Sequence, residues 1–145
     1  MTDQAEQVWG GFNVKMDEKW RVIVPAAARG ALDGGTVLAR GKDRCVYLFS
    51  HPQFDAFRTK VQANTPAEIP PTAFDRLFYS SVVKQDMDRQ GRITIPAGLR
   101  GYASLERELV IVGLEERLEI WDAAKWDAFQ AKYIDQFAES FEGVR

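Results

Sequence analysis

Two short segments of the chain repeat one pattern, in which an arginine follows an aspartate by four residues. Residues 16–29 are MDEKWRVIVPAAAR and residues 87–100 are MDRQGRITIPAGLR. In each segment, three strand-forming residues and Pro-Ala come directly after the arginine. An aspartate can hold a guanidinium in a defined pose, from which the arginine meets a phosphate or the edge of a guanine. The alternative is a charge-assisted pair that only stabilises a hairpin.

The candidates for contact with DNA are the basic residues in and near these two motifs. Arginine and lysine neutralise phosphates, and arginine also binds guanine with two donors. The motif aspartates are expected to orient the arginines, and a glycine in the second motif suits the positive φ of a tight turn. The candidate contacts are Arg21, Arg92, Lys19, Lys15, Arg89 and Lys84, and the orienting residues are Asp17, Asp88 and Gly91.

The similarity between the two parts of the chain extends beyond the motifs. At a shift of 71, the residues at 16, 17, 21, 25, 26 and 29 recur, and at a shift of 72 Gly41, Ala56 and Phe57 meet Gly113, Ala128 and Phe129. Two matching blocks in the same order indicate an internal duplication.

Each copy predicts the same order of elements. A strand enters the motif, a second strand leaves it and stops at a proline, and a short helix follows. Two more strands come next, and then a longer helix whose N-cap is Ser50 or Asp122, with a capping box at Ser50–Gln53. The expected strands are 12–16, 21–24, 36–40 and 46–49 in the first copy, and 82–87, 92–95, 108–112 and 118–121 in the second.

We expect an α+β fold in which the two copies complete one sheet system. Each copy has about four short strands and too little sheet of its own, so pairing about a pseudo-twofold axis is expected. The predicted divisions are a first half with its helix at 8–64, a proline-rich linker and short helix at 65–79, and a second half with its helix at 80–145. The aromatic residues along both longer helices are expected to form core or subunit contacts.

The overall charge does not suggest a protein that coats nucleic acid by bulk attraction. The net charge is −2 and the pI is near 5.5. Basic residues nevertheless gather around the motifs, with seven against four acids over 13–44 and five against three over 82–107. Residues 108–145 carry four basic residues against nine acids. Ordinary solvated surface is the alternative explanation of this distribution.

The sequence argues against a membrane protein and against an enzyme. No apolar run approaches eighteen residues, no secretory signal is expected, and the single Cys45 fits a reducing cytoplasm. His51 lies in a predicted helix cap, and Cys45 has no second histidine as a partner. The sequence has no cluster of His, Cys or carboxylate residues at the spacing of metal ligands, and no glycine-rich phosphate loop follows a predicted strand. We therefore expect no metal, no cofactor and no catalysis.

The motif Asp-x-x-Gly-Arg-Ile-x-Ile-Pro, with Leu-Glu-Ile-Trp downstream, resembles the MraZ family of bacterial regulators, which are related to AbrB-type swapped-hairpin DNA-binding proteins. The resemblance covers roughly residues 9–142. It implies two tandem AbrB-like halves of β-β-α-β-β order, protomers assembled into rings such as octamers, and double-stranded promoter DNA as the partner.

The resemblance also implies a biological role. It implies a sequence-specific and mainly repressing transcriptional regulator that binds tandem short repeats upstream of the division and cell-wall gene cluster, including its own gene. Association with the nucleoid in the cytoplasm is implied as well. Carried over to this chain, the motif residues are Asp17 with Arg21 and Asp88 with Arg92, and Arg21 is the leading contact with Arg92 second.

The first copy departs from the family pattern at two positions. Trp20 stands where the family usually has glycine, and Trp9 stands before Gly10 where the family has arginine. A tryptophan in a left-handed turn costs about 1–2 kcal/mol, so the first hairpin is expected to differ in shape. Trp20 either stacks on a sugar or base or packs against protein.

The main competing hypothesis is a ring-forming scaffold that binds another protein and no DNA. The acidic helix expected within 122–142 combines apolar spacing with charge and could dock a partner. An AbrB-like antitoxin is a narrower alternative, but such chains usually carry one motif and this chain carries two.

Overall fold

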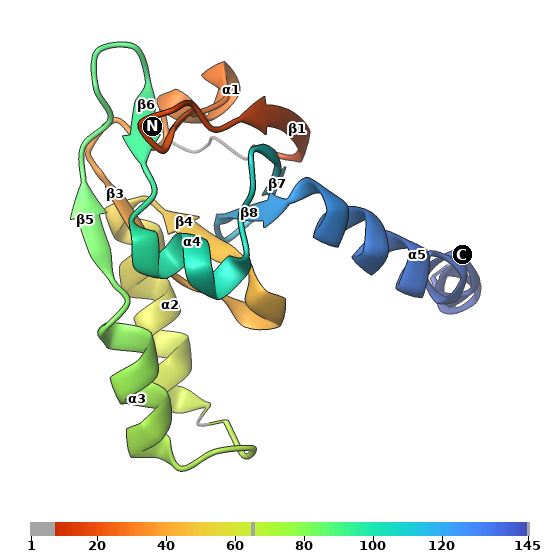
Figure 1. Cartoon of the computed structure of the whole chain (residues 1–145). Helices are drawn as coiled ribbons and strands as arrows, with labels where there is room; N and C mark the ends of the chain where they lie inside the picture. The colour runs from red at the N-terminus through yellow and green to blue at the C-terminus, as the bar shows by residue number, and fades with distance from the viewer. Residues whose placement is uncertain (1–7, 65, 145) are drawn as a thin grey trace.

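The computed structural model describes residues 8–64 and 66–144, which form eight strands and five α-helices (Figure 1). The strands are β1 (Gly10–Lys15), β2 (Arg21–Ile23), β3 (Thr36–Arg40), β4 (Val46–Phe49), β5 (Val83–Gln85), β6 (Arg92–Thr94), β7 (Glu108–Gly113) and β8 (Leu118–Asp122). The α-helices are α1 (Ala26–Arg29), α2 (His51–Ala63), α3 (Pro71–Tyr79), α4 (Ala97–Ala103) and α5 (Ala123–Glu139). Two short 3₁₀ helices, η2 (Lys42–Arg44) and η3 (Ser140–Gly143), are also present.

The expected α+β class is confirmed, and all strand pairs are antiparallel. Six strands form one sheet in the order β1-β7-β8-β4-β3-β5, and β2 and β6 form a separate two-stranded ribbon. The sheet therefore combines strands of the two sequence copies.

The strand pairings are equivalent when the two copies are exchanged. The entering strand β1 pairs with β7 of the second copy, and its counterpart β5 pairs with β3 of the first copy. The return strands β2 and β6 pair with each other, as do β4 and β8. Neither copy forms its sheet without the other, as the small size of each half predicts.

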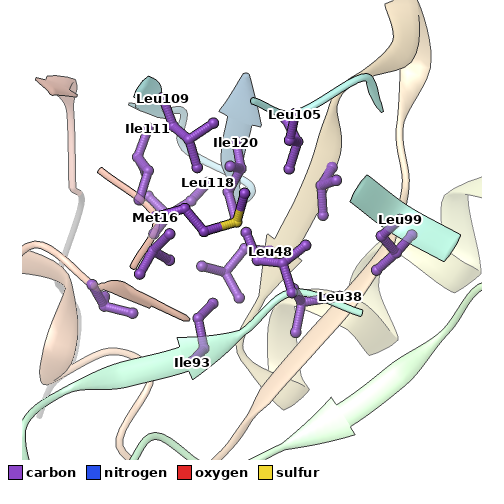
Figure 2. Close-up of a cluster of buried hydrophobic side chains, with 14 of the residues drawn as sticks. Met16, Leu38, Leu48, Ile93, Leu99, Leu105, Leu109, Ile111, Leu118 and Ile120 are labelled. Carbon is purple, nitrogen blue, oxygen red and sulfur yellow. The ribbon is translucent and has the colours of Figure 1, made fainter. Parts of the chain in front are cut away.

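Alternating side chains of the sheet supply two cores, one on each face. Leu38 and Leu48 point toward the ribbon, where they meet Ile93 and residues of both copies (Figure 2). Val22, Val24, Ile93 and Ile95 are all buried in this first core, as their spacing predicts. On the opposite face, an aromatic core lies under α2, α3 and the first turns of α5.

The two longer helices begin differently. Ser50 caps α2 with the predicted capping box, since its side chain accepts from the Gln53 amide and the Gln53 side chain accepts from the Ser50 amide. Asp122 occupies the N-cap position of α5, but its side chain does not cap that helix. Its carboxylate instead accepts from the Glu106 amide at 3.0 Å, so the predicted capping role of Asp122 is wrong.

The helices α2 and α3 pack side by side, whereas α5 extends away from the sheet in another direction (Figure 1). The helix α3 begins at Pro71, inside the segment 65–79 where a proline-rich linker and a short helix are predicted, because a proline fits the first turn of a helix. Both hairpin motifs lie on the other side of the sheet, at the ends of the β2–β6 ribbon.

Candidate nucleic-acid interface

The first motif is a tight turn organised by the carboxylate of Asp17. One carboxylate oxygen accepts from the amides of Lys19 and Arg21 at 2.8 and 2.9 Å, and the other accepts from Arg21 Nε at 2.9 Å. The backbone closes the turn between Asp17 and Arg21 at 2.9 Å. One aspartate therefore fixes both the backbone and the guanidinium.

The second motif repeats this geometry. Asp88 accepts from the amides of Gln90 and Arg92 at 2.9 and 2.8 Å, and from Arg92 Nε at 2.7 Å. Gly91 has a φ of 79°, the positive angle expected of a glycine at this position. Trp20, at the equivalent position of the first motif, has a φ of 64°. The expectation that the first hairpin differs in shape is wrong, because the same hydrogen bonds hold Trp20 in the left-handed conformation.

Arg21 and Arg92 lie on one outward face of the β2–β6 ribbon. The register pairs Arg21 with Thr94 and Ile23 with Arg92, while the central pair of Val22 and Ile93 is buried. Because side chains alternate along a strand, the two arginines share the face opposite that buried pair. Their side chains are 28% and 27% exposed, so both guanidinium groups reach solvent.

The way in which each arginine is held leaves its outer nitrogens directed away from the aspartate. In the described part of the chain, the hydrogen bonds and ion pairs of both guanidinium groups use Nε only. Backbone amides, followed by the arginine side chain, hold the pKa of Asp17 and of Asp88 below the usual value of 3.8. Both carboxylates are thus ionised at neutral pH, and each presents an oriented guanidinium that can bind an anion or a guanine edge.

The other candidate basic residues are arranged around the tips of the two turns. Lys19 and Arg89 are exposed within the turns, and Lys15 is exposed at the end of β1, just before the first motif. Lys84 lies apart. Its neighbour Gln85 turns toward the ribbon and exchanges hydrogen bonds with the Thr94 backbone at 2.7 and 3.0 Å, so the alternation of β5 directs Lys84 to the other side.

Sequence reasoning assigned no role to the last arginine of each motif, and the structure gives it one. Arg29 Nε donates to the Val24 carbonyl at 3.0 Å, and Arg100 Nη1 donates to the Ile95 carbonyl at 2.7 Å. Each arginine also contacts the turn of the other copy. The only signal for this role was the repetition of the arginine at matching positions.

The contacts of these two arginines explain the difference between the turns. The Arg100 guanidinium lies 4.1 Å from the centre of the Trp20 ring, a cation–π contact that joins the two copies. Arg29 approaches Gly91 so closely that an added Cβ would lie 2.5 Å from its Nε. Trp20 remains 49% exposed, so it packs on protein with one part of its surface and leaves the rest to solvent.

The residues considered for catalysis lie elsewhere. Cys45 is buried, its Sγ donates to the Lys42 carbonyl at 3.4 Å, and burial raises the pKa of the thiol, which suppresses the reactive thiolate. His51 opens α2. Residues 8–64 and 66–144 contain no group of three His, Cys, Asp or Glu side chains that could hold a metal ion. None of the described helices is both long and apolar enough to cross a membrane.

Comparison with known proteins gives one consistent result. The model of the family described as "MraZ protein, putative antitoxin-like" matches twice, over residues 8–77 and 78–143. The protein named Transcriptional regulator MraZ of Salinispora tropica is 39% identical over 135 residues, which are 93% of this chain and 95% of that protein. The proteins of the same name from Clavibacter michiganensis and Thermobifida fusca are 38% and 39% identical over 135 residues, 93% of this chain and 94% of each relative.

Proposed function

The chain belongs to the MraZ family, and we propose that it is a DNA-binding transcriptional regulator. The proposal rests on the relatives' shared name and on one feature of the geometry. Two guanidinium groups, each oriented by an aspartate, lie on the same outward face of one ribbon. A solvated, oriented pair of arginines on an exposed two-stranded ribbon suits contact with DNA phosphates or with guanine edges in the major groove.

We assign Arg21 and Arg92 as the leading DNA contacts, with Lys19, Arg89 and Lys15 as supporting phosphate contacts. Asp17, Asp88 and Gly91 serve to orient and shape the turns. Lys84 is the weakest candidate, because it points away from the ribbon face. No catalytic role is proposed, in keeping with relatives that are named as regulators.

The finer role follows from the family resemblance. We propose that the protein recognises tandem short repeats in the promoter of the division and cell-wall gene cluster, including its own gene, and represses transcription from that promoter. We also propose that it is associated with the nucleoid in the cytoplasm. The exchange of strands between the two copies supports the proposal that the fold is of the AbrB-like swapped-hairpin type. The corresponding units are residues 8–64 and 80–145, with 65–79 between them.

Tandem repeats suit a protein whose single contact is weak. A handful of phosphate contacts gives nonspecific dissociation constants of about 10⁻⁴–10⁻⁶ M at physiological salt. If several protomers assemble into a ring, identical ribbons recur at fixed spacing and engage several DNA boxes at once. Such linkage can add roughly 10²–10⁴ to the apparent affinity with no new type of contact.

Titration of labelled promoter DNA across a range of salt concentrations tests the proposal. We expect log affinity to fall linearly with log salt concentration, because phosphate contacts release counterions. The Arg21→Ala/Arg92→Ala variant should bind more weakly, with a slope shallower by about one for each phosphate that is no longer neutralised. The variant Arg21→Lys/Arg92→Lys should keep phosphate binding but lose sequence preference if the arginines bind guanine with two donors.

The matched control is Arg58→Ala/Lys125→Ala, which removes the same charge from exposed positions on α2 and α5. This control should bind DNA as the unmodified chain does. Equal weakening in both double variants would mean that only the net charge matters. If the chain does not bind DNA even at low salt, the DNA proposal is wrong and the protein-scaffold hypothesis is favoured.

A further inference from the structure

The outward face of the β2–β6 ribbon carries four side chains, those of Arg21, Ile23, Arg92 and Thr94. The register sets Arg21 opposite Thr94 and Ile23 opposite Arg92, so the two arginines occupy diagonal corners of this face. Ile23 and Thr94 occupy the other two corners. An isoleucine and a threonine therefore lie directly beside the guanidinium groups that we assign to DNA contact.

The hydrogen-bond pattern of the ribbon brings Ile23 close to Arg92. The Val24 amide donates to the Gly91 carbonyl at 2.8 Å, so these two residues form a hydrogen-bonded pair of the ribbon. Hydrogen-bonded and non-hydrogen-bonded pairs alternate along antiparallel strands, which makes Ile23 and Arg92 a non-hydrogen-bonded pair. The Cα atoms of such a pair are only about 4.5 Å apart, and the two side chains lie next to each other.

The side chain of Ile23 is large, apolar and 49% exposed. A single exposed hydrophobic residue is normal on a soluble protein and needs no explanation by itself. Thr94 shows, however, that the ribbon does not require an apolar residue here, because it occupies the equivalent position in the second copy and is exposed and β-branched as well. The isoleucine thus adds apolar surface between two oriented guanidinium groups without being needed for the strand.

The chemistry of the major groove suits this combination of side chains. A two-stranded ribbon can enter the groove, where the edges of the base pairs present hydrogen-bond donors and acceptors. The one apolar group on these edges is the C5-methyl group of thymine. Arginine reads guanine with two donors, and an apolar side chain contacts the thymine methyl. Arg92 and Ile23 together therefore offer the contacts that a guanine and a nearby thymine require.

We propose that Ile23 is a base-reading residue that contacts the C5-methyl group of a thymine in the DNA site. This inference rests on the DNA-binding function that we propose, and it adds a specificity-determining residue to that function. Residues two apart on a strand are separated by about 6.8 Å, which is roughly the rise of two base pairs. Because Ile23 lies beside Arg92 and two residues from Arg21, we expect the thymine within about two base pairs of a guanine that either arginine reads.

Replacement of thymine by uracil tests the contact, because uracil lacks only the methyl group and keeps every donor and acceptor of the base. The full chain is titrated at low salt with promoter duplexes in which one thymine at a time is replaced by uracil. At one or more positions, we expect the unmodified chain to bind the uracil duplex about four-fold more weakly, the effect of withdrawing one methyl group from an apolar contact. Ile23→Ser should bind the thymine and uracil duplexes equally at the same positions.

Two further variants separate the contact from general effects on the protein. Ile23→Val keeps a β-branched apolar side chain and should retain most of the four-fold ratio. The matched control is Ile134→Ser, which changes an isoleucine of similar exposure, 52%, on α5. This control should keep the four-fold ratio between the two duplexes whatever its absolute affinity.

The possible failures are distinguishable. The inference is overturned if the unmodified chain binds every uracil duplex as tightly as the thymine duplex, since no methyl group is then in contact. It is also overturned if Ile23→Ser keeps the four-fold ratio, because the uracil then acts through the shape of the DNA or through another residue. In both cases the chain still binds DNA, and the proposed function stands. Absence of binding to all duplexes at low salt overturns the proposed function and this inference together.

Discussion

At the scale of single residues, the aspartate of each motif acts as the centre of a turn. Asp17 and Asp88 each accept two backbone amides on one oxygen and an arginine Nε on the other. This geometry gives each pair a structural role in its turn, and it is compatible with the proposed contact with DNA. One carboxylate stabilises the turn through the backbone and at the same time holds the arginine by Nε, so the outer nitrogens of the guanidinium are not used by that carboxylate.

The pKa values of these aspartates predict a pH dependence of stability. Both folded-state values lie below the ordinary 3.8, mainly because the carboxylates accept backbone amides. A depressed pKa contributes stability that is complete above the unfolded value and is lost as the pH falls through the folded value. We therefore expect this contribution to be present at pH 7 and to decline below pH 3.8.

The variant Asp17→Asn/Asp88→Asn isolates this contribution from that of other carboxylates. Asparagine keeps an acceptor oxygen but cannot ionise. Urea unfolding at pH 7 and at acid pH should show that the variant is less stable than the unmodified chain at pH 7, and that the gap narrows below pH 3.8. A gap that stays constant with pH would show that the charge of these aspartates contributes nothing.

Trp20 gives a second prediction at this scale. Its left-handed conformation costs about 1–2 kcal/mol, and the contact with Arg100 returns about 0.5–1 kcal/mol. Trp20→Ala keeps the unfavourable φ and removes the cation–π interaction, whereas Trp20→Gly removes the unfavourable φ as well. Urea unfolding should therefore show Trp20→Gly to be more stable than Trp20→Ala by about 1 kcal/mol. The reverse order would mean that the turn opens when the ring is removed.

At the scale of elements, a largely buried ion pair links strand β8 to the aromatic core under α2, α3 and the first turns of α5. Arg117 donates to Glu119 through Nε and Nη2 at 3.1 and 2.9 Å, and it also lies over the Tyr47 ring. The other oxygen of Glu119 accepts from Trp121 Nε1 at 3.0 Å. The pair thus connects strand β8 with the aromatic residues beneath α2 and α5.

Removing Glu119 should be costly for this reason. Glu119→Ala leaves the indole N–H of Trp121 without its acceptor and leaves the Arg117 guanidinium with only the longer pair to Glu116 at 3.6 Å. We expect a loss of about 2 kcal/mol in the free energy of unfolding. Glu119→Gln keeps an acceptor for Trp121 and should lose about half as much. Glu115→Gln, on the exposed turn nearby, serves as the control and should stay within about 0.5 kcal/mol of the unmodified chain. Equal stability of Glu119→Ala and this control would contradict the structural role of the pair.

The sequence predicts the elements better than it predicts the contacts between them. Alternation and proline positions were enough to locate the eight strands, and the repeat was enough to predict that the two copies pair. Arg29 and Arg100 each contact the motif turn of the other copy, and these contacts depend on a fold that brings together segments far apart in the chain. No local sequence pattern could therefore predict them. Asp122 shows the converse, since a residue with the right local pattern for a cap is held by a distant amide instead.

At the scale of the whole molecule, the duplication places two equivalent turns on one ribbon and leaves α2 and α5 inequivalent. The symmetric part presents Arg21 and Arg92 together. In the asymmetric part, α3 packs over α2, and no helix of the described residues packs over α5 in the same way. The ribbon that carries the proposed DNA contacts and the first turns of α5 therefore lie on opposite faces of the sheet.

The assembly of protomers that we propose from the family resemblance predicts how affinity depends on the number of DNA boxes. If protomers are linked, promoter DNA with three boxes should bind the unmodified chain roughly 10²–10⁴ times more tightly than DNA with one box. Phe137→Asp places a charge on the exposed apolar side of α5 and leaves the ribbon untouched, so it should bind one box as the unmodified chain does. If that side of α5 links protomers, this variant should lose the gain from additional boxes. Titrations of one-box and three-box duplexes at a single salt concentration measure both effects. The coupling is absent if one box binds the unmodified chain as tightly as three. If Phe137→Asp keeps the full gain, the protomers are not linked through the exposed side of α5.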